Sequence, residues 1–281
     1  MINILDNIIE EGLNRIEKQP ITNRRIDNII LGKSVYTMKN VDNIFTDMNL
    51  CLVLTNAGYG FSYFQEEIDF EYTKSIVNTD IKNALKMKIP LFLRVALADC
   101  LFSISGTSGK NRYFAGTLQQ KATLRAKEIM KTIPKGSSVS LLGASSEIVE
   151  EAKAKNCNLR VIDYEESKIG LSLYGNIVEN GKNQLSEHLL ESDYIIATGM
   201  IFVTDTADSI FHFIKEHNKK LIIYMQTGSN IGHALIKYGA QKVLCEYFPY
   251  YDFSGPTRYS VFEMKDNLIN GFWPHFGKNS T

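Results

Sequence analysis

Two positions twenty residues apart, Gly143 and Asp163, have the types and spacing that a nucleoside-binding site needs. Each follows a short apolar segment that predicts a buried strand, and neighbouring parallel strands end at the same edge of a sheet. A glycine at the first strand end lets the backbone turn tightly and approach a ligand. A carboxylate at the second commonly accepts the ribose hydroxyls of a nucleotide. The pair therefore favours a nucleotide-type ligand, with Asp163 on its ribose.

Both residues also have plainer structural explanations. Gly143 can serve only a tight strand-to-helix turn, with Ser145 as the N-cap of the helix that follows. Asp163 can be an exposed loop carboxylate beside Glu165 and Glu166, which we expect to be solvated. The loop around Gly143 also lacks the G-x-G-x-x-G pattern of dinucleotide sites, which argues against a pyrophosphate-binding turn.

Later strand ends carry further polar groups that can reach the same edge of the sheet. Thr198 and Gly199 follow the third predicted strand, where one side of a bound ligand would lie. Thr204 or Asp205 can contact the ligand, or can equally be the N-cap of the next helix.

The fourth predicted strand ends in a glycine-containing loop, residues 226–230, that again opens a helix. The fifth ends at Glu246, a carboxylate that can act on a ligand directly or through a bridging water. An aromatic group follows, which can stack on a flat ring or pack between domains: Tyr247, Phe248, Tyr250 and Tyr251.

The cysteines and histidines are not spaced for a dedicated metal site. No two cysteines form a C-x-x-C pair and no two histidines lie at i, i+4, the spacings that bring two ligands together. We therefore expect no bound metal and four reduced thiols, Cys51, Cys100, Cys157 and Cys245. No Ser-His-Asp or Cys-His pattern marks a covalent nucleophile either.

The elements that would position these groups alternate regularly after residue 138. Short apolar segments predict strands at residues 139–142, 159–163, 194–197, 221–225 and 243–247. Periodic segments between them predict helices at residues 145–155, 184–190, 207–215 and 231–238. This alternation indicates an α/β fold with a Rossmann-like, doubly wound and mainly parallel sheet covered on both faces.

The first part of the chain predicts a small α+β domain. Its expected elements are helices at residues 2–17, 73–86 and 90–102, and strands at residues 25–31 and 50–55. A helix over residues 117–133, with Thr117 as N-cap, would join the two parts. We place the N-terminal α+β domain at residues 1–116 and the Rossmann-like cofactor-binding domain at residues 117–281.

Composition restricts the partners. Lys+Arg and Asp+Glu both number 31, which gives a formal net charge of +0, whereas nucleic-acid binders carry a basic excess. No apolar run reaches membrane-spanning length, and the N-terminus lacks the pattern of a signal peptide. We therefore expect a cytoplasmic homo-oligomer that binds a small-molecule substrate, with no nucleic-acid or membrane partner.

The order of these segments resembles the heavy-metal chelation family, whose function is unsettled. The likeness lies in the Gly143 loop, in the strand that ends at Asp163, in residues 25–60, and in residues 192–206, which include Thr198 and Gly199. This resemblance implies a small α+β domain before a Rossmann-like domain, and a protein that binds a small molecule or a metal complex. The cysteine and histidine spacing does not support chelation itself.

Within the same architecture, the chain also resembles the methanogen pyridinol C-methyltransferases that use S-adenosyl-L-methionine (SAM). Those enzymes serve the assembly of the iron-guanylylpyridinol cofactor of a hydrogenase. The likeness lies in length, in the Ile-, Asn- and Lys-rich composition, in the frame of Gly143 and Asp163, and in the polar residues 113–120. It implies SAM as cofactor and a hydroxypyridine as methyl acceptor. The single glycine departs from the multi-glycine loop of ordinary methyltransferases.

This second resemblance implies a role for each candidate residue. The SAM site would consist of Gly143, Ala144, Ser145, Asp163, Tyr164, Thr198 and Gly199. Substrate would be bound by Thr117, Gln119 and Thr204, and the catalytic polar groups would be Thr117, Thr198 and Glu246. Two alternatives stay open, a non-catalytic binding protein and an NAD(P)-binding oxidoreductase. The missing second and third glycines argue against the oxidoreductase.

Overall fold

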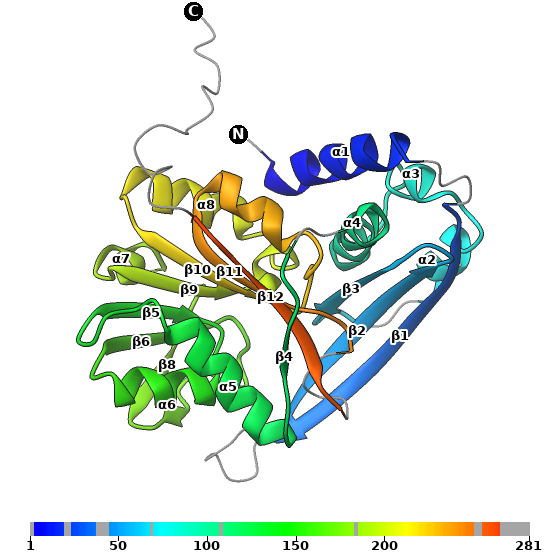
Figure 1. The fold of residues 1–281 in the computed structure, drawn as a ribbon. Coiled ribbons are helices and arrows are strands. Elements are labelled where there is room, and N and C mark those ends of the chain that lie inside the picture. The colour runs from blue at the N-terminus through cyan, green and yellow to red at the C-terminus, as the bar shows by residue number, and fades with distance from the viewer. Residues whose placement is uncertain are drawn as a thin grey trace, which may run out of the picture.

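A computed structural model describes residues 3–19, 24–37, 45–67, 70–106, 109–182, 185–249 and 255–264. A small antiparallel sheet and a large, mainly parallel sheet lie side by side, with helices packed around both (Figure 1). The α/β fold class expected from the sequence is confirmed. No helix among these residues is both long and apolar enough to span a bilayer.

The described residues form a large sheet of nine strands in the order β4-β12-β11-β10-β9-β5-β6-β8-β7. The strands are β4 (Arg112–Phe114), β5 (Ser138–Leu142), β6 (Asn158–Asp163), β7 (Ser172–Leu173), β8 (Asn176–Asn180), β9 (Tyr194–Thr198), β10 (Lys220–Met225), β11 (Ala240–Glu246) and β12 (Thr257–Glu263). Strands β11, β10, β9, β5, β6 and β8 run parallel, whereas β12, β4 and β7 are antiparallel to their neighbours. The chain leaves β5 towards β6 and later returns to β9 on the other side, so the switch point lies between β5 and β9.

Helices cover both faces of this sheet. The helices α5 (Leu118–Met130) and α6 (Ser146–Ala154) pack on one face. The helices α7 (Leu185–Leu190), α8 (Ala207–Glu216) and the 3-10 helix η2 (Gly232–Tyr238) pack on the other. Side chains alternate across a strand, so Ile196 packs towards α5 and α6 while Ile195 packs the opposite way.

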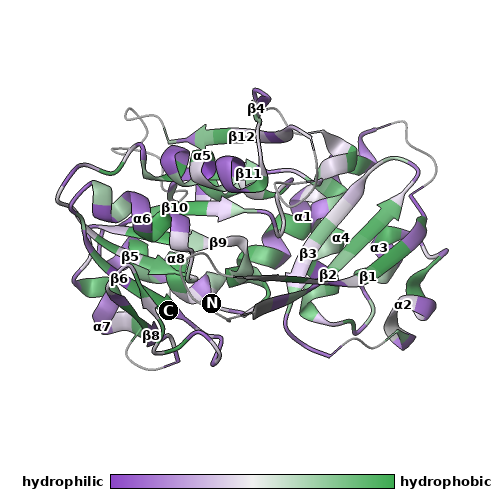
Figure 2. Ribbon diagram, turned by 90° about the horizontal axis from the view of Figure 1, so that it is seen from below, coloured by the Kyte–Doolittle hydropathy of each residue, from purple (hydrophilic) through white to green (hydrophobic). Residues whose placement is uncertain are grey.

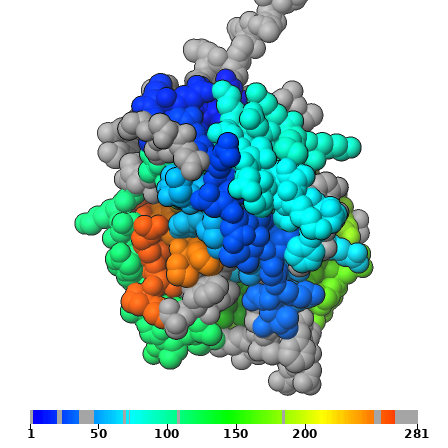
Figure 3. All heavy atoms as spheres, turned by 90° about the vertical axis from the view of Figure 1, so that its right-hand side faces the viewer, coloured from blue at the N-terminus to red at the C-terminus, as the bar shows by residue number. Residues whose placement is uncertain are grey.

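The small sheet has the order β1-β2-β3, with β1 (Ile26–Thr37), β2 (Phe45–Thr55) and β3 (Tyr59–Phe64). Beside it lie α1 (Ile4–Glu17), α2 (Glu71–Ile76), α3 (Ile81–Ala84) and α4 (Leu91–Ser105). Helix α4 is buried on almost every side, and its ribbon is mostly apolar in Figure 2. It belongs to one hydrophobic cluster that runs from β2 and β3 to α8 and β10. The two sheets therefore share a continuous core. Strand β1 lies on the surface in Figure 3.

Several elements differ from the sequence prediction. The single helix expected over residues 73–86 is wrong, because Asn78 adopts φ 66° and divides the segment into α2 and α3. The side chain of Asp80 then caps α3 by accepting the Lys82 N–H. The helix expected near residue 231 is a 3-10 helix. The series of strands does not close at residue 247, since β12 and β4 extend it, and β3 was also not anticipated. Because β4 pairs with β12, the large sheet begins before the boundary drawn at residue 116.

Candidate functional site

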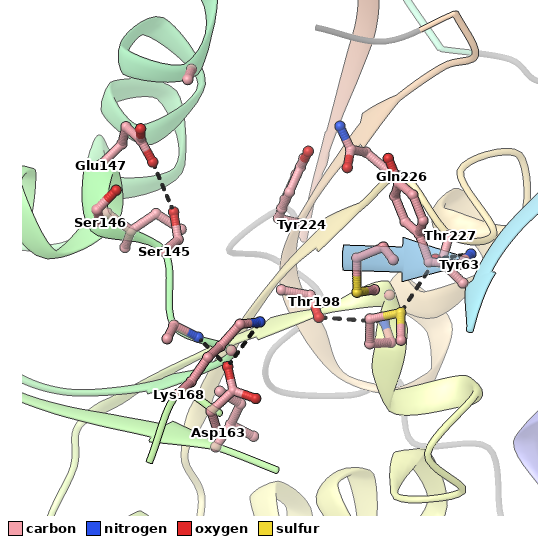
Figure 4. A pocket seen from close by; sticks show the side chains of 18 of the residues that line it. Tyr63, Ser145, Ser146, Glu147, Asp163, Lys168, Thr198, Tyr224, Gln226 and Thr227 are labelled. Carbon is pink, nitrogen blue, oxygen red and sulfur yellow. Dashed lines mark hydrogen bonds and ion pairs between the residues drawn. The ribbon is translucent and has the colours of Figure 1, made fainter. Parts of the chain in front are cut away.

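A cavity of about 740 Å³ opens at the carboxyl ends of β5, β6, β9 and β10, at the switch point of the large sheet (Figure 4). Small-molecule pockets commonly measure roughly 300–1,000 Å³. Residues of the small sheet and of the segment after it close the opposite side, namely Val35, Met48, Tyr63 and Gln65. Both parts of the chain therefore line the cavity. The contribution of the small sheet was not anticipated from the sequence.

The turn after β5 depends on glycine. Gly143 has φ +105°, and a Cβ built there would lie 3.2 Å from Thr198 Cγ2, so a side chain would be strained and would crowd β9. The Gly143 N–H donates to the Ile162 carbonyl at 2.8 Å, which joins the ends of β5 and β6. This turn leaves backbone, with no side chain, facing the switch point.

Asp163 lies beside this turn, as its spacing from Gly143 predicted. Its carboxylate is buried and accepts the Ala144 N–H at 2.8 Å and the Glu165 N–H at 3.0 Å. An ionised carboxylate offers about four lone-pair positions. These two hydrogen bonds therefore orient Asp163 and leave acceptor capacity towards the cavity. Tyr164 follows and lines the same wall, and burial, with the charge of Asp163, raises the pKa of its phenol.

The expectation that Glu165 is solvated is wrong. The Lys168 ammonium lies 2.6 Å from the Glu165 carboxylate and 3.7 Å from that of Asp163, and all three side chains are largely buried. Lys168 lines the cavity and lies next to Asp163 in Figure 4. Glu166 does agree with the expectation, because its side chain is 83% exposed. Lys168 was not singled out in the sequence, although its i, i+3 spacing from Glu165 could have indicated the pair.

Helix α6 points its N-terminus at the cavity. Ser145 occupies the N-cap position as expected, but its hydroxyl makes no capping hydrogen bond and lies 3.5 Å from the Glu147 carboxylate. The first N–H groups of a helix have no partner within the helix, and the dipole is positive there. Ser145, Ser146 and Glu147 all line the cavity. The N-terminus of α6 can therefore bind an anionic group, and the Glu147 carboxylate beside it can bind a cationic one.

Thr198 and Gly199 lie in the middle of the cavity wall. The Thr198 hydroxyl accepts the Met200 N–H at 3.4 Å and begins the 3-10 helix η1 (Gly199–Phe202). A Cβ at Gly199 would lie 2.2 Å from the Thr227 carbonyl oxygen, so this position requires glycine. Thr204 also lines the cavity. It is not the N-cap of α8, and neither is Asp205, because Thr206 holds that position.

A second polar wall faces the Asp163 side across Thr198 (Figure 4). Arg125 of α5, Tyr224 of β10 and Gln226 line it. Glu246 lies behind them, fully buried, and accepts from the Tyr224 hydroxyl at 2.8 Å and from Gln226 Nε2 at 3.2 Å. Helical spacing could have indicated Arg125, because Leu118, Ala122 and Arg125 follow one face of the predicted helix and all line the cavity.

Most of the residues singled out in the sequence line this cavity, and the others have different positions. Gln119, Gly143, Ala144, Ser145, Asp163, Tyr164, Thr198, Gly199 and Thr204 line it. Thr117 is the N-cap of α5 in a reciprocal capping box with Gln120, and neither Thr117 nor Glu246 belongs to the lining. Tyr247 is buried beneath the Arg258 guanidinium, and Tyr250 and Tyr251 lie outside the described residues.

The described part of the chain contains no group of three or more His, Cys, Asp or Glu side chains that could hold a metal ion. Of the cysteines, Cys51, Cys100 and Cys245 are buried, and burial raises the pKa of Cys51 and Cys100 to about 12. All four cysteines are free thiols.

The sequence matches no family profile and no curated protein. Its fold is similar to that of a DUF364-family protein of unknown function from Desulfitobacterium hafniense, with a TM-score of 0.58 at 10% identity, covering 92% of this chain and 100% of that one. A second DUF364-family protein of unknown function, from Pyrococcus horikoshii, gives a TM-score of 0.49 at 14% identity, covering 93% of this chain and 100% of that one. At such identities the likeness to the first structure concerns the fold alone.

Proposed function

We propose that the protein is a SAM-dependent C-methyltransferase that acts on a hydroxypyridine. The observation that carries this proposal is the contact between Ala144 and Asp163 at the switch point, on the wall of a cavity with two polar sides. A cavity of about 740 Å³ has room for a nucleoside and an acceptor together. The resemblance to the pyridinol methyltransferases supplies the reaction, and the geometry is compatible with it.

The residues present fit the needs of SAM better than those of a dinucleotide. SAM has no phosphate, and its ribose needs a hydrogen-bond acceptor, which Asp163 offers beside the Gly143 turn. Its amino-acid end carries a carboxylate and an ammonium. The free N–H groups at the start of α6 suit the carboxylate, and Glu147 suits the ammonium. The carboxylates of Asp163 and Glu165 outnumber the Lys168 ammonium, which disfavours a ribose phosphate.

The acceptor would then lie on the other side of Thr198, against Tyr63, Tyr224 and Gln226. When bound, SAM supplies a methyl group on a sulfonium centre. Loss of the hydroxyl proton of a hydroxypyridine pushes electron density onto the neighbouring ring carbon. The protein contributes by orienting the ring and stabilising its oxyanion. Gln119, Thr198 and Thr204 line the cavity and could assist in orienting the acceptor. Thr117 is the N-cap of α5 and could act only through its neighbours.

Equilibrium binding of S-adenosylhomocysteine (SAH), SAM, NAD and NADP tests the proposal. A ligand that binds the native state raises the free energy of unfolding by mass action, by roughly 2.7 kcal/mol at about 100-fold saturation. We expect SAH and SAM to raise the melting temperature and NAD and NADP to leave it unchanged. A shift with NAD alone would favour the oxidoreductase. Binding of SAH with no methyl transfer to any hydroxypyridine would favour a non-catalytic binding protein.

A further inference from the structure

A chain of hydrogen bonds runs through the second polar wall. The Arg125 guanidinium donates to the Tyr224 hydroxyl at 3.1 Å, and the Tyr224 hydroxyl donates to Glu246 Oε2 at 2.8 Å. Arg125 also lies 3.6 Å from the same carboxylate oxygen and stacks over the Tyr224 ring, with its Cζ 4.7 Å from the ring centroid. Both hydrogen bonds run in the same direction, from Arg125 through the Tyr224 hydroxyl to the Glu246 carboxylate. Arg125 and Tyr224 line the cavity, so the chain connects the cavity wall with a buried carboxylate.

The burial of this chain distinguishes it from an ordinary surface ion pair. The Arg125 side chain is 5% exposed and that of Glu246 is fully buried, yet Arg125 and Tyr224 line the cavity. Buried ion pairs contribute little net stability, because desolvation offsets their attraction. Stability therefore does not explain this charged pair, and its place in the cavity wall favours a role towards a bound ligand. The sequence indicated Glu246 as a polar catalytic group, but Glu246 does not line the cavity, whereas Tyr224 and Arg125 do.

We propose that Tyr224 and Glu246 form a proton relay for an acceptor with an ionisable ring hydroxyl. This inference rests on the proposed function, and it adds the route of the proton. The acceptor O–H bond breaks with its electron pair left on the acceptor oxygen, and that proton forms a bond to the Tyr224 oxygen. The Tyr224 proton passes at the same time to Glu246. Tyr224 ends as a neutral phenol, and Glu246 ends as a carboxylic acid.

The charges of the buried groups support this direction of transfer. Before transfer the Arg125 cation faces the Glu246 carboxylate, and afterwards it faces the acceptor oxyanion. One cation and one anion are present in both states, so no net charge is added to the buried wall. Gln226 donates to Glu246 Oε2 and keeps that oxygen oriented towards Tyr224. The relay thus creates the electron-rich ring without a strong base exposed to solvent.

Visible absorbance of bound 4-nitrophenol tests the relay, because its anion is coloured and its neutral form is not. The probe is titrated with the full-length protein, with and without SAH, at a pH where free 4-nitrophenol is mostly protonated. We expect the parent protein to hold the probe largely as the anion. Tyr224→Phe and Glu246→Gln should each reduce the bound anion about tenfold or more. Tyr194→Phe is the matched control, since its hydroxyl contacts Lys220 Nζ at 3.1 Å, at the other end of β9.

The sign of the Glu246→Gln effect is decisive. If Glu246 were only a structural partner of Arg125, removing its negative charge would increase the bound anion. An increase, an unchanged spectrum in both variants, or no binding of the probe to the parent protein would overturn the relay. A cooperative urea-unfolding transition like that of the parent shows that each variant is folded. Failure of SAH to bind the parent protein contradicts the proposed function instead, while the spectra without SAH still report on the relay.

Discussion

The Ala144 N–H and the Asp163 carboxylate are joined by a hydrogen bond of 2.8 Å that ties the loop after β5 to the end of β6. Asp163 therefore has two roles that its position in the sequence did not separate. It stabilises the turn next to Gly143, and it presents its remaining acceptor capacity to the cavity. A substitution there should change both stability and ligand binding, and the two effects can be measured separately.

Asp163→Asn should weaken SAH binding about ten- to a hundredfold, because it removes charge-assisted hydrogen bonds worth roughly 1.5–3 kcal/mol each. The variant should also lose about 1–3 kcal/mol of unfolding free energy, since one of the Ala144 and Glu165 N–H groups loses a carboxylate acceptor. Isothermal titration and urea unfolding measure the two quantities.

Glu166→Gln is the control for Asp163→Asn, because Glu166 is exposed and Glu165 is not. Unchanged SAH affinity in Asp163→Asn would show that the ribose is bound elsewhere. Equal weakening in Glu166→Gln would show that the ligand contacts the exposed side of this loop, and the assignment of the ribose to Asp163 would be wrong.

Lys168→Met should destabilise the protein while keeping the aliphatic stem. It leaves the carboxylates of Asp163 and Glu165 facing one another with no cation between them. Removing one partner of a buried ion pair costs up to about 3–5 kcal/mol. Lys182→Met is a matched control, because its pair with Glu166 is exposed and such pairs contribute roughly 0–1 kcal/mol. Equal midpoints of urea unfolding in the two variants would contradict the role assigned to Lys168.

The alternation of strands and helices made part of the site predictable from the sequence. Strand ends in a doubly wound sheet meet at one edge, so Gly143, Asp163 and Thr198 could be brought together without a structure. The same rule predicted the edge on which Thr204 and Glu246 lie. It could not show that Glu246 is sealed behind Tyr224, because burial depends on how far each side chain reaches past its neighbours.

Long-range packing determines the rest of the site. Tyr63 and Gln65 line the cavity because the Tyr63 N–H donates to the Thr227 hydroxyl and the Phe61 carbonyl accepts from the Gly228 N–H. These contacts join β3 to the loop after β10 across more than half of the chain, and no local pattern specifies them. β12 was also missed, because it pairs antiparallel with both β11 and β4 and so falls outside the alternation of parallel strands and helices.

Gly143→Ala should reduce both stability and SAH affinity. A left-handed φ costs a non-glycine residue about 1–3 kcal/mol, and the added methyl group would contact Thr198 Cγ2. Gly136→Ala is a useful control because it has a similar positive φ but nothing within 4 Å of the added Cβ. The backbone cost should appear in both variants, and the loss of SAH affinity only in Gly143→Ala. Weakened binding in both would mean that global stability, and not the turn, controls the affinity.

The unfolding free energy should also depend on pH through Asp99, which lies at the junction of the two sheets. Its carboxyl accepts the Phe61 N–H at 3.0 Å and the Asn230 N–H at 2.6 Å, and burial raises its pKa from 3.8 to about 7. Between these two pKa values the folded protein keeps a proton that the unfolded chain loses. The unfolding free energy should therefore fall as pH rises through this window, and should level off above about pH 7.

Comparison of Asp99→Asn with the parent protein isolates this contribution, because asparagine does not titrate. One pKa unit corresponds to about 1.4 kcal/mol, so from about pH 5 to about pH 8 the parent should lose roughly 2–3 kcal/mol more than the variant. Urea unfolding at both pH values measures the difference even if Asp99→Asn is less stable throughout. Glu166→Gln should keep the parent's dependence, since Glu166 is exposed. If Asp99→Asn keeps the parent's slope as well, Asp99 is ionised in the folded protein and its N–H donors outweigh its burial.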